Sequence, residues 1–205
     1  MKFKKPRAKL LWHSPIWAMV YAARTSHGSE KRTASTDKEW DKRDKELIYT
    51  LVIKGHLSIL EHLVFCFELE FPRSVLQELS RHRIGISPTV RSSRFTLHKT
   101  DEIELYDTGS TSMNETLQNH IFSLVSYKKD LKFPNDTIKA ILPEGVMTKG
   151  VYTINARALR NLFELRTGSE VYKPFRELMW EIWKEIPDTL KFLFEDVNKM
   201  FGKGV

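Results

Sequence analysis

The sequence predicts a mixed α+β fold in which helix exceeds strand, and two patterns support this prediction. Residues 61–70 (EHLVFCFELE) place apolar side chains at every second position, which is typical of a half-buried strand. The segment after Pro72 and residues 155–165 instead space their apolar side chains as an amphipathic helix does. The 205 residues can bury one sizeable core, so we expect a single domain over 1–205.

Local signals predict the elements that precede this strand. We expect a strand over 7–13, a helix over 15–24 and a polar loop over 25–37. Thr36 or Asp37 is expected to cap the next helix, because a side-chain oxygen there can accept a hydrogen bond from the first turn. Gly55 marks the end of that helix.

Pro72 is expected to open a helix, because its missing N–H costs nothing in the first turn. This helix should continue into Arg81-His82-Arg83 until Gly85 and Pro88 break it, which makes the following segment an ordered loop. The remaining expected elements are helices over 112–129 and 135–142, a β-like segment over 150–154, a helix over 155–165, and a final helix or helix pair over 170–200 that breaks near Pro187.

The composition, 41% hydrophobic and 29% charged, is typical of a soluble globular protein. No apolar run approaches the ~18 residues that a membrane span requires. The apolar stretch after the basic N-terminus is too short for a secretory signal, so we expect a cytoplasmic protein without membrane association.

The sequence offers weak candidates for metal binding and for a cysteine nucleophile. His56, Glu61 and His62 match no common zinc spacing, so no metal is expected. Cys66 is the only cysteine, which excludes an internal disulfide. It lies within the alternating strand without a neighbouring base, so we interpret it as buried and inert.

The net charge of +7 is compatible with binding either to nucleic acid or to a small phosphorylated ligand. The arginines concentrate in residues 81–94 and 157–166, a pattern that favours a discrete site over a broad basic surface. Residues 81–94 (RHRIGISPTVRSSR) combine guanidinium and hydroxyl groups, which together bind phosphate well. Glu78 is the only carboxylate within four residues of this segment, so little nearby can neutralise its positive charge. The sequence therefore predicts an anion site over residues 81–94.

Three motifs in order resemble the flavin-dependent thymidylate synthases. Residues 81–95 resemble the family signature RHRxxSxNxxSxRY. Upstream, residues 56–62 read His-x-Ser-x-x-Glu-His, as in the family, and are followed by a strand and a helix that ends in RHR. Downstream, residues 141–166 (ILPEGVMTKGVYTINARALRNLFELR) resemble the block LP…T…T-x-NAR…N…LR.

This resemblance implies an α+β subunit with a central antiparallel sheet, assembled as a homotetramer with FAD and substrate between subunits. The family converts dUMP to dTMP. It takes the one-carbon unit from methylenetetrahydrofolate and the hydride from FAD that NADPH has reduced. It needs no cysteine nucleophile, and no nucleic-acid partner is implied.

The resemblance also assigns roles to residues of this chain. The implied FAD-binding residues are Ser58, Arg81, His82, Arg83, Asn155, Arg157 and Asn161. The implied nucleotide-binding residues are Glu78, Arg81, Arg91, Ser92, Ser93, Arg94, Lys149 and Arg166, with Arg94 and Lys149 at the phosphate. Arg166 is the implied catalytic residue, because a fixed cation against the pyrimidine favours its N3-deprotonated form.

The chain departs from the family pattern near the nucleotide. Three residues rather than two separate RHR from Ser87, and Thr89, Val90 and Phe95 replace a usual asparagine, glutamate and tyrosine. Glu78 stands where glutamine is usual, and Lys149 where arginine is common. These changes leave open a hydroxymethylase of dUMP or dCMP, in which Glu78 would accept a hydrogen bond from the cytosine amino group. An inactive flavin-binding homologue and a nucleic-acid-binding module are further alternatives.

Overall fold

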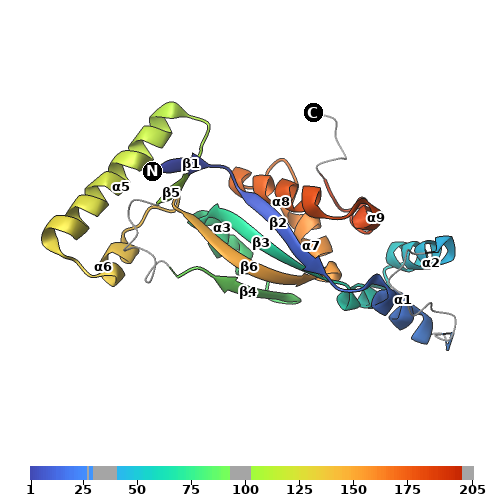
Figure 1. Ribbon diagram of the computed structural model, residues 1–205. Helices are drawn as coiled ribbons and strands as arrows, with labels where there is room; N and C mark the ends of the chain where they lie inside the picture. Colours follow the sequence, from blue (N-terminus) through green and yellow to red (C-terminus); the bar gives the residue numbers. More distant parts are fainter. Residues whose placement is uncertain (27, 30–40, 93–102, 200–205) are drawn as a thin grey trace.

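A computed structural model describes residues 1–26, 28–29, 41–92 and 103–199 of the chain. Its centre is a four-stranded antiparallel sheet in the order β2-β3-β6-β4 (Figure 1). The strands are β2 (Arg7–His13), β3 (Val64–Pro72), β6 (Met147–Asn155) and β4 (Ile86–Val90). The structure therefore confirms the predicted α+β class.

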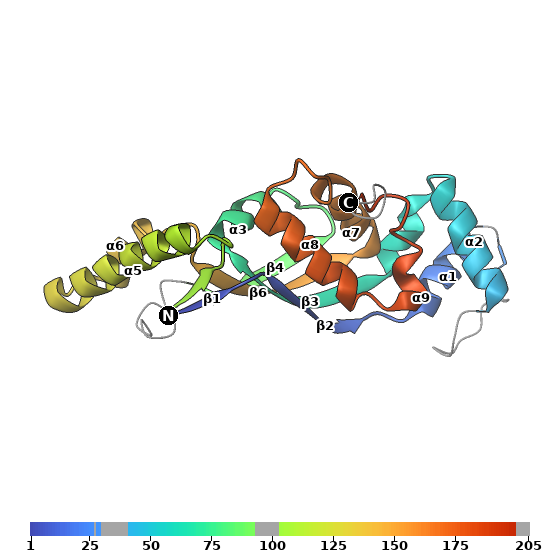
Figure 2. The same ribbon diagram turned by 90° about the horizontal axis from the view of Figure 1, so that it is seen from above.

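The alternation in β3 determines which face of the sheet is covered. Phe65, Phe67 and Leu69 are fully buried, and their β6 partners Tyr152 and Ile154 lie on the same face. Among the described elements, the helices pack on this face, as Figure 2 shows for α3, α7 and α8. The resulting core is aromatic and aliphatic, with Phe163, Phe175 and Phe194 completing it from the helical side.

Most of the predicted helices agree with the structure within a few residues, although the last one ends at Lys191 and not near residue 200. They are α1 (Ile16–Thr25), α2 (Lys42–Ile53), α3 (Arg73–Leu79), α5 (Thr111–Leu131), α6 (Asn135–Ala140), α7 (Ala156–Arg166), α8 (Lys173–Glu185) and α9 (Asp188–Lys191), with a 3₁₀ helix η2 (Leu57–His62) between α2 and β3. The break near Pro187 separates α8 from α9, as predicted. Among the described residues, none of these helices has the length and apolar character to span a membrane.

The N-terminal cap of α2 differs from the prediction. Asp41 accepts a hydrogen bond of 2.8 Å from the backbone N–H of Asp44 and begins the helix. Thr36 and Asp37, the expected caps, lie outside the described residues. Gly55 follows the helix with a positive φ of 79°, which confirms the expected end.

The prediction for the segment around the RHR motif is wrong in two respects, the end of the helix before it and the loop after it. Helix α3 ends at Leu79, before Arg81, and Ile86–Val90 forms strand β4 instead of a loop. Pro88 is tolerated there because β4 is an edge strand, where one side of the backbone needs no donor. This strand fixes the position of the RHR turn against β6.

A smaller unit extends from the end of the sheet, and the sequence does not predict its two-stranded sheet. Strands β1 (Lys2–Lys4) and β5 (Glu104–Tyr106) pair in parallel, and the long helix α5 projects away from the sheet beside α6 (Figure 1). A second, small core forms here from Leu105, Ile121, Ile138 and Leu142. The hydroxyl of Tyr106 donates to Glu177 on α8 at 2.9 Å and joins the two units.

Candidate active site

Arg166 lies at the centre of a cluster built from three helices and a turn. It is the last residue of α7, and its Nη1 donates to Oε2 of Glu78 on α3 at 2.9 Å. Its Nε donates to Nε2 of His82 at 3.1 Å, and its guanidinium lies 5.1 Å from the ring centre of Phe175 on α8. The side chain is about one-fifth exposed, since it retains 22% of its free surface. The guanidinium is therefore held on two edges and one face while the site remains open to a ligand.

Burial and the contact with Arg166 favour the neutral form of His82 and determine which ring nitrogen carries its proton. Burial lowers the pKa of His82 below its ordinary value of 6.5, and the Arg166 cation lowers it further, against an opposing effect of Glu78. Because the arginine Nε–H can only donate, Nε2 of the imidazole must accept. The neutral ring thus carries its proton on Nδ1, which is left as a donor.

We expect His82 to make the folded protein sensitive to acid. A lowered native pKa means that the unfolded chain binds this proton more readily, so the contribution to stability is complete above about pH 6.5 and is lost as pH falls through the native pKa. Urea unfolding midpoints should therefore drop between about pH 7.5 and about pH 5. His82→Gln keeps an acceptor for Arg166 but does not titrate, so its drop should be smaller. An equal drop in both proteins would contradict the assignment.

Asn155 connects the RHR turn to the start of α7. Its side chain caps the helix by accepting a 2.8 Å hydrogen bond from the N–H of Ala158, and its own N–H donates to the carbonyl of Gly85 at 2.9 Å. Gly85 has a φ of 73°, and a Cβ added to it would lie 2.5 Å from the Asn155 amide nitrogen. The turn and the helix therefore approach so closely that glycine is required.

The first turn of α7 meets η2 through a second arginine–carboxylate pair. Nη1 of Arg157 donates to Oε1 of Glu61 at 2.6 Å. Ser58 lies on the same 3₁₀ helix, and Asn161 lies one turn after Arg157 on the exposed face of α7. Four of the residues that the family resemblance assigns to the cofactor thus flank one helix start: Ser58, Asn155, Arg157 and Asn161.

Three further arginines are available to an anion. Arg81 and Arg83 lie in the exposed turn after α3, and Arg91 is exposed just after β4. Within the described part of the chain, none of the three has a carboxylate partner. Ile84 in the same turn is 90% exposed, which is unusual for a large apolar side chain. The turn thus offers free cations and an apolar surface together.

Lys149 lies in a different setting from the other predicted site residues. Its Nζ pairs with Glu68 at 2.7 Å and with Glu70 at 3.4 Å, and these bonds raise its pKa. The pairing of β3 with β6 places all three on the sheet face opposite the helices. Arg91 is adjacent, since its N–H donates to the Lys149 carbonyl at 2.8 Å. Ser92 follows at the exposed end of β4, whereas Ser93 and Arg94 lie outside the described residues.

Two contact residues of the site were not predicted from the sequence. Phe175 belongs to the apolar stripe of α8 and is fully buried, so nothing in its spacing distinguishes it from a core residue. Glu61 was noted only beside His56 and His62, although its role here is to pair with Arg157. The available signal for Glu61 was its position as a carboxylate in the segment 56–62, between His56 and His62.

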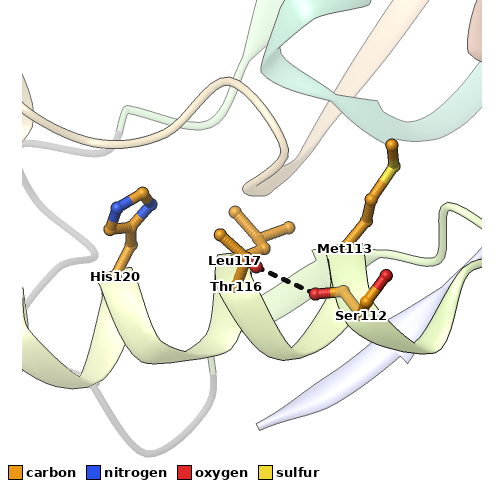
Figure 3. A pocket seen from close by; sticks show the side chains of 5 residues that line it. All are labelled: Ser112, Met113, Thr116, Leu117 and His120. Carbon is orange, nitrogen blue, oxygen red and sulfur yellow. Dashed lines mark hydrogen bonds between the residues drawn. The ribbon is translucent and has the colours of Figure 1, made fainter.

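Other polar features lie outside this site. A pocket on α5 is lined by Ser112, Met113, Thr116, Leu117 and His120, and the Thr116 hydroxyl donates to the Ser112 carbonyl at 2.9 Å (Figure 3). Over the described ranges, no group of three or more His, Cys, Asp or Glu side chains is placed to hold a metal. Cys66 is buried, and its thiol receives only a long contact of 3.8 Å from Thr153, as suits an inert cysteine.

The arginine cluster and the exposed apolar surface beside it have the chemical character that suits an anionic, ring-containing ligand. Comparison with known proteins makes the class specific: the family described as "Thymidylate synthase complementing protein" (Thy1) matches residues 9–190. A flavin-dependent thymidylate synthase of Helicobacter pylori is 34% identical over 175 residues, which cover 77% of this chain and 84% of that protein. A flavin-dependent thymidylate synthase of Campylobacter jejuni is 34% identical over 201 residues, which cover 91% of this chain and 94% of that protein. The chain therefore belongs to the flavin-dependent thymidylate synthase family.

Solved structures support the same assignment. The crystal structure of thymidylate synthase X from Helicobacter pylori with FAD and dUMP has a TM-score of 0.85 and 31% identity, and the match covers 95% of this chain and 99% of that one. The methylase PolB of Streptomyces cacaoi shares the fold, with a TM-score of 0.74 at 20% identity.

Proposed function

We propose that this protein converts dUMP to dTMP, with methylenetetrahydrofolate as the one-carbon donor and FAD reduced by NADPH as the source of hydride. The observation that carries the proposal is the fixed guanidinium of Arg166, held by Glu78, His82 and Phe175. His82 is flanked in the chain by Arg81 and Arg83, which have no carboxylate partner among the described residues. The crystal structure of the Helicobacter pylori relative with FAD and dUMP supports it further.

The residues around the start of α7 fit a flavin dinucleotide. FAD combines a diphosphate with a flat ring, and the turn after α3 offers two exposed arginines and the exposed Ile84. The residues that would hold it are Ser58, Arg81, His82, Arg83, Asn155, Arg157 and Asn161. When bound and reduced, FAD supplies the hydride that completes the methyl group. Arg157 would exchange its bond to Glu61 for the cofactor, which an exposed pair allows at small cost.

The nucleotide would be bound by its phosphate and by its base. Arg91, Ser92, Ser93 and Arg94 would supply guanidinium and hydroxyl donors for the phosphate, and Arg81 would also contact the nucleotide. Lys149 would join them only by giving up part of its contact with Glu68 and Glu70. Arg166 would lie against the pyrimidine and stabilise the negative charge of its N3-deprotonated form, which makes C5 a better nucleophile toward the one-carbon unit. Glu78 would complete the contact with the base.

We also propose a homotetramer with active sites between subunits, in the cytoplasm. None of the described helices covers the opposite face of the sheet, which carries the half-exposed Trp12. Cross-strand neighbours on this face carry opposite charges, as in Lys9 beside Glu68 and Arg7 beside Glu70. A face that carries both charges can pair with the same face of a second copy. Arg91 and Lys149 lie on this face, whereas Arg166 lies on the helical side. A site between subunits would bring both groups to one substrate.

Flavin binding provides a direct test of this proposal. The purified protein should take up FAD to saturation and show flavin absorbance, and its affinity for random nucleic acid should be low. A colourless protein that binds nucleic acid with a steep dependence on salt would contradict the proposal and support the nucleic-acid-binding alternative.

A further inference from the structure

The segment after α9 lies against the same helix that carries Arg166. In this segment, residues 193–199, which we call the strap, include Leu193 and Phe194, and both are fully buried. The ring centre of Phe194 lies 5.5 Å from that of Phe163 on α7. The match to the family ends at residue 190, before the strap begins. The strap therefore adds contacts to α7 that the family match does not include.

Arg160 fixes the strap to the middle of α7. It is a buried arginine, and both of its Nη nitrogens contact the carboxylate of Asp196 in the strap. Its Nη1 also donates to the carbonyl of Leu193 at 2.8 Å. A bidentate pair between arginine and a carboxylate is geometrically specific, so this contact determines where the strap lies along the helix.

Thr167 fixes the strap to the last turn of α7. This residue is only 2% exposed, and its Oγ1 accepts a 2.9 Å hydrogen bond from the backbone N–H of Lys199. The same hydroxyl donates to the carbonyl of Phe163, which is one of the four carbonyls at the end of the helix that lack a partner within it. A chain of hydrogen bonds thus runs from the strap through Thr167 into the end of α7.

The strap and the residues around Arg166 restrain opposite ends of one side chain. Glu78, His82 and Phe175 hold the guanidinium. Thr167, the next residue in the chain, holds the backbone from which the Arg166 side chain extends. A long side chain keeps one position only when both of its ends are fixed, and the last turn of a helix otherwise tends to fray. The strap supplies the backbone half of this restraint.

We propose that Thr167 is a positioning residue, which together with the strap keeps the Arg166 guanidinium in place against the pyrimidine. The proposal rests on the proposed function, because the contact between Arg166 and the base belongs to that function. A misplacement of about 1 Å in a reacting site can cost about 10²-fold in rate. Loss of the Thr167 hydroxyl should therefore slow the chemistry. FAD should stay bound, because Arg157 and Asn161 lie nearer the start of α7.

Thr167→Val tests this proposal, because valine has nearly the shape of threonine but forms neither hydrogen bond. In the FAD-loaded variant, single-turnover formation of dTMP from the reduced enzyme should slow by about ten- to a hundredfold. Reduction of the flavin by NADPH, measured without dUMP, should keep its normal rate. Thr167→Ser keeps the hydroxyl and should restore most of the dTMP formation, whereas a role in packing alone would make valine the better substitute.

Lys199→Pro removes the other half of the hydrogen bond, because proline has no backbone N–H. It should slow dTMP formation in the same direction as Thr167→Val. The double variant should be no slower than Thr167→Val alone, since both changes delete the same bond. Lys199→Ala is the matched control, because it removes the exposed ammonium group but keeps the N–H, and it should behave like the unaltered protein.

Hydrogen exchange reports on the end of α7 without depending on activity. The amides of residues 163–167 should exchange about tenfold faster in Thr167→Val and Lys199→Pro than in the unaltered protein or Lys199→Ala. Unchanged exchange in both variants, or normal dTMP formation in Thr167→Val, would overturn the proposal. An equal slowing of flavin reduction, or additive effects in the double variant, would also overturn it. Failure of the proposed function would look different, because the unaltered protein would then form no dTMP.

Discussion

Replacing Arg166 by alanine is expected to reduce turnover by about 10²–10³-fold or more while FAD remains bound. The structure holds this guanidinium on two edges and one face, through Glu78, His82 and Phe175. Charge stabilisation by a fixed group is lost entirely when that group is removed, because water in an open site must reorganise to replace it. Single-turnover kinetics with the FAD-loaded variant would measure the loss.

Arg166→Lys is the matched control, because it keeps the charge but cannot donate to Glu78 and His82 from a planar fork. It should recover only part of the lost rate. Retention of FAD in Arg166→Ala, measured by flavin absorbance after gel filtration, separates the catalytic role from a structural one. Loss of FAD from Arg166→Ala, or turnover close to normal, would contradict the role assigned to Arg166.

Gly85→Ala is expected to lower the free energy of unfolding by about 2 kcal/mol or more and to weaken FAD binding. Two costs add at this position. A φ of 73° is unfavourable for alanine, and the new Cβ would lie 2.5 Å from the Asn155 amide. Asn155 would have to move and release its cap on α7, so the damage reaches the proposed cofactor site.

Gly109→Ala separates these two costs. Gly109 has a similar φ of 81°, but a Cβ added there would meet nothing within 4 Å. Urea denaturation should therefore show a loss of only about 1 kcal/mol for Gly109→Ala, with FAD affinity unchanged. An equally small loss in Gly85→Ala would show that the contact with Asn155 is not restrictive.

The sequence was sufficient to predict elements with strong local signals. The alternation of residues 61–70 predicts the strand and its buried face, because side chains in a strand alternate between faces. The motifs also identify Asn155 and Arg157, which lie at the start of one helix in the structure. Such motifs predict position because some residue types have local structural roles, as when an asparagine caps the start of a helix.

Features that depend on distant parts of the chain were missed. Gly85 and Pro88 indicated a loop, and only pairing with β6, some sixty residues later, makes Ile86–Val90 a strand. The partners of Lys149 are on β3, and Phe175 reaches Arg166 from α8. Strands β1 and β5 are three residues each, too short to show a period, and they pair although they are far apart in the sequence.

The central claim is the reaction itself, and the most direct test is the mass of its product. The FAD-loaded protein would be mixed with dUMP, methylenetetrahydrofolate and NADPH, and the nucleotides would be separated and identified by mass spectrometry. We predict dTMP, formed only when all components are present. A hydroxymethyl nucleotide, or a reaction only when dCMP replaces dUMP, would contradict the proposed function.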